Sequence, residues 1–435
     1  MRYSTIGQVV WLPLVLALTF SACRAPTAPG SAAPSGAAAP AEGAAPAAPA
    51  AQSAPEAIVI GAALPLTGQE SRAGGYFKTA YEMAADEVNA DGGILVAEYN
   101  MKIPVRLVIQ DDQTDQNLSR NLYERLATVD KVNFFLGGYS TGLGVAHAPV
   151  ADQYKIPYVT GGEAAVEIFN RGQKYIFGAL SSVENLATST MEWIKYWQDQ
   201  GQLAKPAKIA LLWENTSHGK DYQRGVQNFV KANPNAFSIV VDEAFQYPGA
   251  TDHRPLLQKV KAANADLFLV DAHLEDYILM QRQYTELGLH HQVVTYGARG
   301  PEKAARDQLG NAADYVAAAN WWSSELPYPA SKSFVQRFEA KYQSTPEWYH
   351  ALAYTAATTL FKAIEQAGSL DRDKVRDALA KTDISNALIP GGKVYFKPDG
   401  QIDNPFVITQ NQPGGGAPIV WPLDAKTGDA TLPMP

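Results

Sequence analysis

Two glycine-rich turns carry the residues best suited to bind a small molecule. Residues 137–142 read GGYSTG, residues 160–163 read TGGE, and each turn follows a short apolar run. Hydroxyls and free backbone N–H groups near the start of a helix suit an anion such as a carboxylate. Glycine-rich turns also serve as plain connections between elements. The residues alone therefore leave both interpretations open.

The segments around these turns predict a strand–helix–strand unit. Val132–Leu136 is an apolar run of strand length, a helix is expected from Gly142 through Gln153, and Ile156–Val159 has the pattern of the next strand. Such a unit places both turns side by side at the carboxyl ends of parallel strands. This is the edge at which open α/β sheets bind ligands.

Catalytic, metal and dinucleotide chemistry is not indicated. The string GGYSTGLG lacks the GxGxxG spacing of a dinucleotide site, and no acidic residue is set up to bind a ribose. There is no G-x-S-x-G nucleophile elbow, and the seven histidines show no HExxH spacing. Glu214, Ser217 and His218 have the residue types of a triad, but residues this close in sequence cannot by themselves form its geometry. We expect no enzyme, no metal site and no cofactor.

Composition narrows the class of protein further. The 435 residues, 46% of them hydrophobic, are enough for a large core and suggest two domains or lobes. A net charge of −8 argues against nucleic acid as a partner, because nucleic acid is bound by basic surfaces. Cys23 is the single cysteine, which excludes an internal disulfide and a cysteine-based metal site.

The N-terminal segment has the pattern of an export signal. Arg2 precedes the apolar run Val9–Phe20, which is too short to span a bilayer well. The small residues before Cys23 resemble the cleavage site of bacterial lipoproteins, so residues 1–22 would be removed and the Cys23 thiol lipidated. A plain secretory signal is the alternative, and both predict export. Residues 23–56 are mainly Ala, Pro, Gly and Ser, which predicts a disordered tether.

The remaining chain alternates between strand and helix patterns. Further strands are expected at 58–64, 105–109, 175–179, 208–213, 238–245, 266–270 and 292–296. Further helices are expected at 73–90, 117–129, 185–200, 222–232, 255–263, 275–287, 331–343, 351–368 and 372–381. This rhythm predicts an α/β protein with parallel sheets covered by helices on both faces. Val394–Phe396 and Phe406–Thr409 are expected to pair as an antiparallel hairpin around Pro398-Asp399-Gly400.

Several segments, taken in order, match one family. They are IVIGAALPLTG (58–68), AADEVNADGGI (84–94), VIQDDQTD (108–115), FFLGGYSTG (134–142), APVADQYKIPYVTGG (148–162), HALAYTAATTLFKAIEQAGSLDRDKVRDALAKT (350–382), YFKPDGQ (395–401) and IVWP (419–422). From residue 58 to 422 the chain resembles the branched-chain amino acid-binding proteins, the leucine/isoleucine/valine-binding solute receptors of a class of ABC importers. No single segment is specific, but their joint order and spacing are.

The resemblance implies the type I periplasmic binding protein fold. In that α/β fold, two Rossmann-like lobes with parallel central sheets are joined by a three-segment hinge and close over a ligand. The first lobe would comprise residues 57–178 and 322–390, the second 179–321 and 391–422, with a C-terminal tail at 423–435. The implied partners are a small solute and a membrane permease. The implied state is a monomer, lipid-anchored at the outer face of the cell membrane or in the periplasm.

The resemblance also assigns roles to the first turn. In the family, hydroxyl and backbone groups of the two first-lobe turns hold the ligand carboxylate. Tyr139, Ser140 and Thr141 keep the expected hydroxyls, so they are expected to contact the ligand. The alternative is that these side chains only cap the turn.

The second turn departs from the family pattern. The family often has small residues followed by a threonine, whereas this chain has Gly162, Glu163 and Ala164. All three are candidate ligand contacts, and Glu163 could accept an ammonium or a hydroxyl of the ligand. The alternative for Glu163 is an exposed acid at the start of the following helix.

The second lobe departs as well. His218 and His273 stand where the family commonly has tyrosines, Asp271 follows a predicted strand, and Arg299 lies near the position of the ammonium-binding acid. Arginine suits a carboxylate, although a lone arginine is usually a solvated surface residue. Either Glu163 or Asp271 takes over the ammonium, or the ligand is not a simple aliphatic amino acid.

The sequence therefore favours a receptor for a small carboxylate-bearing solute, whether an amino acid, an amide or a related organic acid. Branched-chain specificity is disfavoured by the departures in both lobes. A ligand-sensing module that acts through a partner protein is the alternative function.

Overall fold

The computed structural model describes residues 53–435. The predicted signal peptide at 1–22, the predicted lipidation site Cys23 and most of the predicted tether at 23–56 lie outside the described residues. Among the helices of the described part, none combines the length and apolar character needed to cross a membrane.

The first sheet has five strands, all parallel. Its order is β4 (Val105–Asp111), β1 (Ile58–Leu64), β5 (Phe134–Leu136), β6 (Tyr158–Thr160) and β7 (Ile176–Gly178). Parallel strands need crossover connections, which here are helices that cover both faces of the sheet. The strand order reverses between β1 and β5, the place where such sheets open a crevice at their carboxyl ends.

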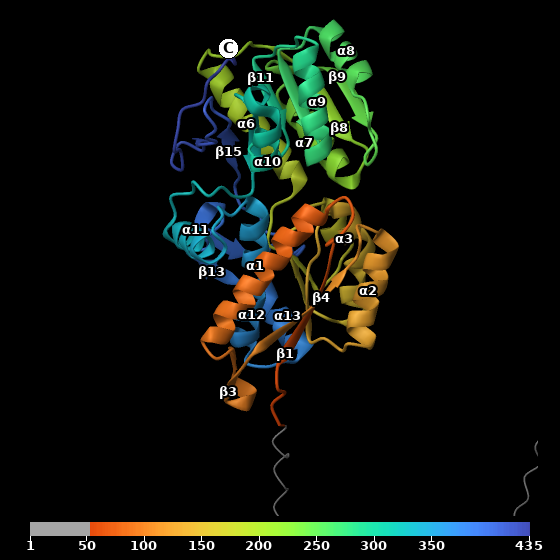
Figure 1. Cartoon of the computed structure of the whole chain (residues 1–435), viewed down its shortest axis with the longest axis vertical. Coiled ribbons are helices and arrows are strands. Elements are labelled where there is room, and N and C mark those ends of the chain that lie inside the picture. The colour runs from red at the N-terminus through yellow and green to blue at the C-terminus, as the bar shows by residue number, and fades with distance from the viewer. Residues whose placement is uncertain (1–52) are drawn as a thin grey trace, which may run out of the picture. The chain divides into compact units, whose positions relative to one another are not determined.

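Helices from both halves of the chain cover the first sheet. One face packs against α1 (Ser71–Ala90) and α12 (Trp348–Ala367), which lie beside each other although more than half of the chain separates them (Figure 1). The other face packs against α2 (Gln116–Thr128) and the shorter helices α3 (Thr141–His147), α4 (Pro149–Tyr154) and α5 (Val166–Phe169). Successive strand residues point to opposite faces, so Phe134 lies in the first core and Phe135 in the second.

The second sheet has seven strands. Its order is β16 (Ile419–Trp421), β15 (Val407–Gln410), β12 (Ala317–Asn320), β11 (Val293–Tyr296), β10 (Leu267–Asp271), β8 (Ala207–Glu214) and β9 (Phe237–Phe245). The strands from β12 to β9 are parallel, and β15 and β16 add antiparallel strands at one edge. The accompanying helices are α6 (Val183–Asp199), α7 (Ser217–Ala232), α8 (Arg254–Ala263), α9 (Leu274–Glu286) and α10 (Lys303–Leu309).

The chain passes between the two sheets three times. It leaves the first sheet after β7, returns after β12 to form α11 (Pro329–Tyr342), α12 and α13 (Arg372–Ala380), and then enters the second sheet again at β15. We refer to the first sheet with its helices as the first lobe and to the second sheet with its helices as the second lobe. The predicted α/β class with parallel central sheets is confirmed.

The predicted C-terminal hairpin is wrong. β14 (Lys393–Tyr395) pairs with β13 (Asp383–Ser385), and β15 pairs instead with β12 and β16. All four residues of β15 are buried, so this strand belongs inside a large sheet. The partner β13 is mostly exposed and has no apolar pattern that would reveal it in the sequence.

Smaller differences also have local causes. The helix predicted through Gln153 is divided into α3 and α4 at Pro149, which has no N–H to donate. The short hairpin of β2 (Ile94–Val96) and β3 (Met101–Ile103) and the helix α10 were not predicted.

Candidate ligand-binding cleft

The carboxyl ends of both parallel sheets meet at one cavity of about 790 Å³. The lining includes residues that follow β1, β4, β5, β6 and β7 of the first sheet and residues that follow β8, β9, β10, β11 and β12 of the second sheet. They include Gln69, Glu70, Gln113, Thr114, Tyr139, Gly162 and Leu180 on one side and Asn215, His218, Tyr247, His273, Arg299 and Trp321 on the other. Both sheets thus place their loops where α/β proteins bind ligands.

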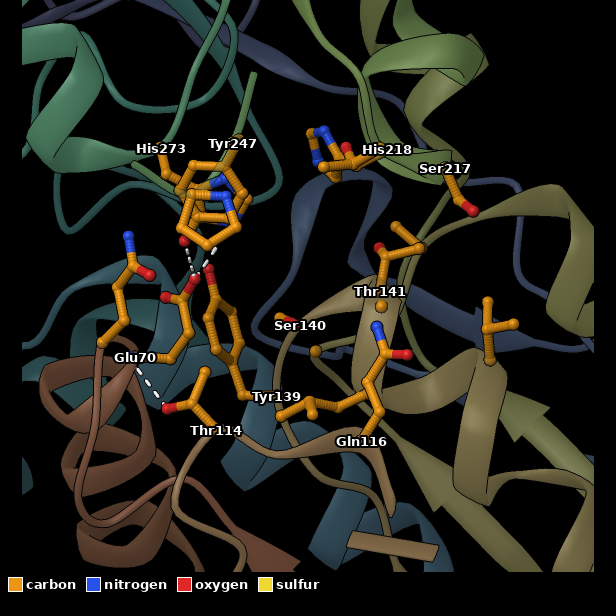
Figure 2. Close-up of a pocket in the computed structure, with 18 of the residues that line it drawn as sticks. Glu70, Thr114, Gln116, Tyr139, Ser140, Thr141, Ser217, His218, Tyr247 and His273 are labelled. Carbon is orange, nitrogen blue, oxygen red and sulfur yellow. Dashed lines mark hydrogen bonds and ion pairs between the residues drawn. The ribbon is translucent and has the colours of Figure 1, made fainter. Parts of the chain in front are cut away.

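Most of the predicted site residues line this cavity. They are Tyr139, Ser140, Thr141, Gly162, Ala164, His218, His273 and Arg299. Figure 2 shows Ser140 and Thr141 on the side of Gln116, opposite Ser217 and His218. Two turns far apart in the sequence therefore present hydroxyl and imidazole groups to the same space.

Glu163 does not line the cavity, and both interpretations drawn from the sequence need correction. Its side chain is fully buried, with no exposed surface. One carboxylate oxygen lies 2.9 Å from His147 Nε2, and the other accepts a hydrogen bond from the Tyr158 hydroxyl. Glu163 is therefore neither placed to contact a ligand nor an exposed helix-terminal acid.

Asp271 also lies behind the cavity wall. It is 2% exposed, and its Oδ2 lies 2.8 Å from His218 Nδ1. Burial alone would raise the pKa of Asp271, but the charge and hydrogen bond of His218, together with the charges of His273 and Arg299, outweigh burial and lower it. Asp271 thus orients the His218 ring, which lines the cavity, rather than facing the cavity itself.

An acid that the sequence did not single out lies at the boundary between the lobes. Glu70, next to α1, accepts a hydrogen bond from the Tyr247 hydroxyl of the second lobe and lies 3.4 Å from His273 Nε2. The rings of Tyr247 and His273 stack at 4.2 Å (Figure 2). Tyr247 follows β9, and its position just after a strand could have marked it in the sequence as a candidate site residue. No motif marks Glu70.

His273 is held in its protonated form by carboxylates. Its Nδ1 lies 2.7 Å from both oxygens of Glu214, and Glu70 lies near its Nε2. Burial alone would lower the pKa of His273, but the two carboxylates outweigh burial and raise it to about 9. At neutral pH the imidazole therefore carries a positive charge.

Arg299 lies in the wall of the cavity rather than on a solvated surface. Its guanidinium donates to the Tyr349 hydroxyl at 2.6 Å and to Glu302 at 3.2 Å, and a second nitrogen donates to the Tyr139 hydroxyl at 2.8 Å. Tyr139 and Tyr349 belong to the first lobe, so Arg299 also links the lobes. Arg299 as a whole residue is 5% exposed.

The cavity offers no built-in metal site within residues 53–435. No group of three or more His, Cys, Asp or Glu side chains is placed there to hold a metal ion. Among the described residues that line the cavity, Glu70 is the one acid, and the bases include Lys220, Arg299 and protonated His273.

Ser140 adopts a strained backbone conformation at the start of α3. Its φ is 75° and its ψ is 141°, a region that residues with a Cβ rarely occupy. Such conformations cost about 1–3 kcal/mol and tend to occur at functional sites. This backbone conformation turns the chain so that Ser140 and Thr141 reach the cavity.

The strain at Ser140 predicts an unusual order of stabilities. Ser140→Gly should be more stable than Ser140→Ala by about 1 kcal/mol, because both lack the hydroxyl but only glycine tolerates positive φ. Urea unfolding of both variants measures the difference. At the exposed helical position Ser333 the order should reverse, since glycine disfavours a helix. Equal stability of the two Ser140 variants would contradict the strain.

The raised pKa of His273 predicts a pH-dependent contribution to stability. A pKa that rises from 6.5 to about 9 on folding stabilises the protein fully below pH 6.5, and this stabilisation is lost as pH rises through about 9. The stability difference between wild type and His273→Gln should therefore shrink by up to about 3 kcal/mol between pH 6.5 and 9.5. Urea unfolding across this range measures it, with exposed His290→Gln as the control. A difference that does not vary with pH would contradict the prediction.

Comparison with known proteins places the chain in a family. The family described as "Periplasmic binding protein" matches residues 57–416. The chain is 26% identical to Leu/Ile/Val-binding protein homolog 7 of Brucella melitensis over 389 residues, which cover 87% of this chain and 94% of the relative.

Solved structures share the fold. A leucine-binding protein of Thermotoga maritima superposes with a TM-score of 0.73 at 20% identity, covering 83% of this chain and 97% of that one. A solute-binding protein of Rhodopseudomonas palustris in complex with 3,4-dihydroxybenzoic acid superposes with a TM-score of 0.70 at 21% identity, covering 83% of this chain and 95% of that one. The chain therefore belongs to the periplasmic binding protein family, whose members are extracytoplasmic solute-binding proteins and not enzymes, and it has the two-lobed α/β fold of type I members.

Proposed function

We propose that this protein is the receptor of an ABC importer and binds a small carboxylate-bearing solute between its two lobes. The observation that carries the proposal is the cavity where the carboxyl ends of both sheets meet, with the hydroxyls of Ser140 and Thr141 opposite His218 of the second lobe. A solute that touches both lobes favours the closed arrangement by its differential affinity. A membrane permease then recognises the closed protein.

The lobe boundaries and the attachment to the membrane belong to the same proposal. We assign residues 57–178 and 322–390 to the first lobe and 179–321 and 391–422 to the second. A lipid on Cys23 would hold the protein, as a monomer, at the outer face of the cell membrane or in the periplasm. The solute is an amino acid, an amide or a related organic acid.

Within this class the charges favour an acid without an ammonium group. Glu70, the one acid among the described lining residues, is already engaged by Tyr247 and His273. An ammonium would therefore have to displace those partners, whereas a carboxylate meets the hydroxyls of Ser140 and Thr141 and the Lys220 ammonium in the same cavity.

The aromatic walls of the cavity favour a planar solute. Trp321, Trp348, Tyr139 and Tyr247 line the cavity together with Leu180. Aromatic walls with a few polar groups are typical of small-molecule sites, and a volume of about 790 Å³ lies in their usual range. The complex of the Rhodopseudomonas palustris neighbour with 3,4-dihydroxybenzoic acid supports this class as the first to test.

The test is a thermal-shift screen of residues 53–435 against hydroxybenzoates, dicarboxylates, amides and amino acids. A ligand at 100 times its Kd stabilises the folded state by about 2.7 kcal/mol and should raise the melting temperature by several degrees. Thr141→Val should weaken binding of the best acid about tenfold, because a hydrogen bond to a charged group is lost. Thr188→Val removes a hydroxyl within α6, away from the cavity, and should leave binding unchanged.

Two results would count against the proposal. Tighter binding of L-leucine or L-valine than of any acid, unaffected by Thr141→Val, would overturn the assigned solute class. No shift with any compound of the panel would overturn the assignment of the cavity to a small carboxylate-bearing solute.

A further inference from the structure

Five polar side chains lie fully buried beneath the cavity turns of the first lobe. They are Asp112, Ser119, His147, Tyr158 and Glu163, and none of them has exposed surface. We call them the buried network. Burying so many polar groups is costly unless each finds a partner, so their arrangement calls for a physical reason.

Hydrogen bonds run through the buried network without a break. Ser119 Oγ lies 3.1 Å from Asp112 Oδ2 and 2.8 Å from His147 Nδ1. His147 Nε2 lies 2.9 Å from Glu163 Oε1, and the Tyr158 hydroxyl donates to Glu163 Oε2. The network therefore joins α2, α3, β6 and the ends of two strands.

Three points of the network adjoin three turns of the cavity. Asp112 Oδ1 accepts the Thr114 N–H at 3.0 Å, and Thr114 lines the cavity. His147 ends α3, whose first residue, Thr141, lines the cavity. Glu163 lies between Gly162 and Ala164, which also line it. Hydrogen bonds of the buried network therefore connect the turns after β4, β5 and β6 on the side that faces away from the cavity.

Two glycines, one in the first turn and one in α3, fit this arrangement. A Cβ at Gly144 would lie 2.7 Å from Glu163 Cδ, closer than real Cβ contacts. A Cβ at Gly138 would lie 3.1 Å from His147 Cε1 and 2.8 Å from the Ala63 carbonyl oxygen. Gly144 lets α3 lie directly against the carboxylate of Glu163, and Gly138 leaves room for the His147 ring.

We propose that Glu163 and His147 are positioning residues, a buried carboxylate–imidazole pair that holds the three cavity turns in register without touching the solute. The proposal rests on the proposed function only in taking this cavity as the solute site. Removing one partner leaves a buried polar group without its hydrogen bond, and the turns are then free to separate.

Hydrogen exchange of the ligand-free protein tests the positioning role directly. The amides of Asp115, Gly144 and Gly162 are hydrogen-bonded to Asp112 O, Ser140 O and Thr160 Oγ1. Glu163→Gln and His147→Gln should each speed exchange of these amides about tenfold or more, the change expected when a buried bond worth over 1 kcal/mol is lost. In the double variant, the two glutamine side chains can hydrogen-bond to each other. This variant should therefore recover part of the protection of the three backbone amides against exchange.

Val375→Ala is the matched control. Val375 is fully buried in α13 of the first lobe, outside the network. It should lower the melting temperature without speeding exchange at the three amides. Tyr158→Phe removes one donor to Glu163 but keeps the pair, so it should have a smaller effect and serves if Glu163→Gln does not fold. Equal acceleration in Val375→Ala, or no recovery in the double variant, would overturn the proposal.

Binding of two named probes gives the second readout. The affinities of 3,4-dihydroxybenzoate and L-leucine are measured well below every melting temperature. For the probe that wild type binds, Glu163→Gln should lose about tenfold in affinity and Val375→Ala should keep it within about twofold, because only the first displaces the turns. Equal loss in both variants would contradict a positioning role. If wild type binds neither probe, neither compound is the solute, and the exchange experiment still decides the role of the pair.

Discussion

Parallel pairing of strands is the constraint from which the site follows. Each strand of a parallel sheet must be joined to the next by a crossover, and the crossover helices here cover both faces of both sheets. Loops with free backbone groups can then gather only at the sheet ends. Because the carboxyl ends of the two sheets meet at one cavity, ten strand ends supply its lining without any change in the core.

Several contacts between the lobes are polar, which suits the proposed opening and closing of the two lobes. Glu70 meets Tyr247 and His273, and Arg299 meets Tyr139 and Tyr349. Such groups can exchange their partners for water at modest net cost, whereas a broad apolar contact would resist opening. A solute that bridges the lobes needs only a small differential affinity to shift such a balance.

Sequence patterns located the strands and the loop residues because both follow local rules. β1 was predicted over its full length from one apolar run. The resemblance to the family pointed to Ser140, His218, His273 and Arg299, and they reach the cavity because each follows a strand. Local rules could not predict the role of residues whose partners are distant in the sequence. The pairing of β15 with β12 spans almost 90 residues of chain and has no local signal.

Glu163 shows the same limit within the site. Its position in a cavity turn was predicted, but the direction of its side chain was not. That direction depends on His147, on Tyr158 and on the space left by Gly144, which no single segment of sequence contains. Its inward direction also changes the charge of the cavity. With Glu163 and Asp271 engaged behind the wall and Glu70 engaged across the lobes, the positive groups His273 and Arg299 face the cavity without a free acid among the described lining residues. The charge that the cavity presents to a solute therefore depends on how the acids are oriented as well as on which residues the chain carries.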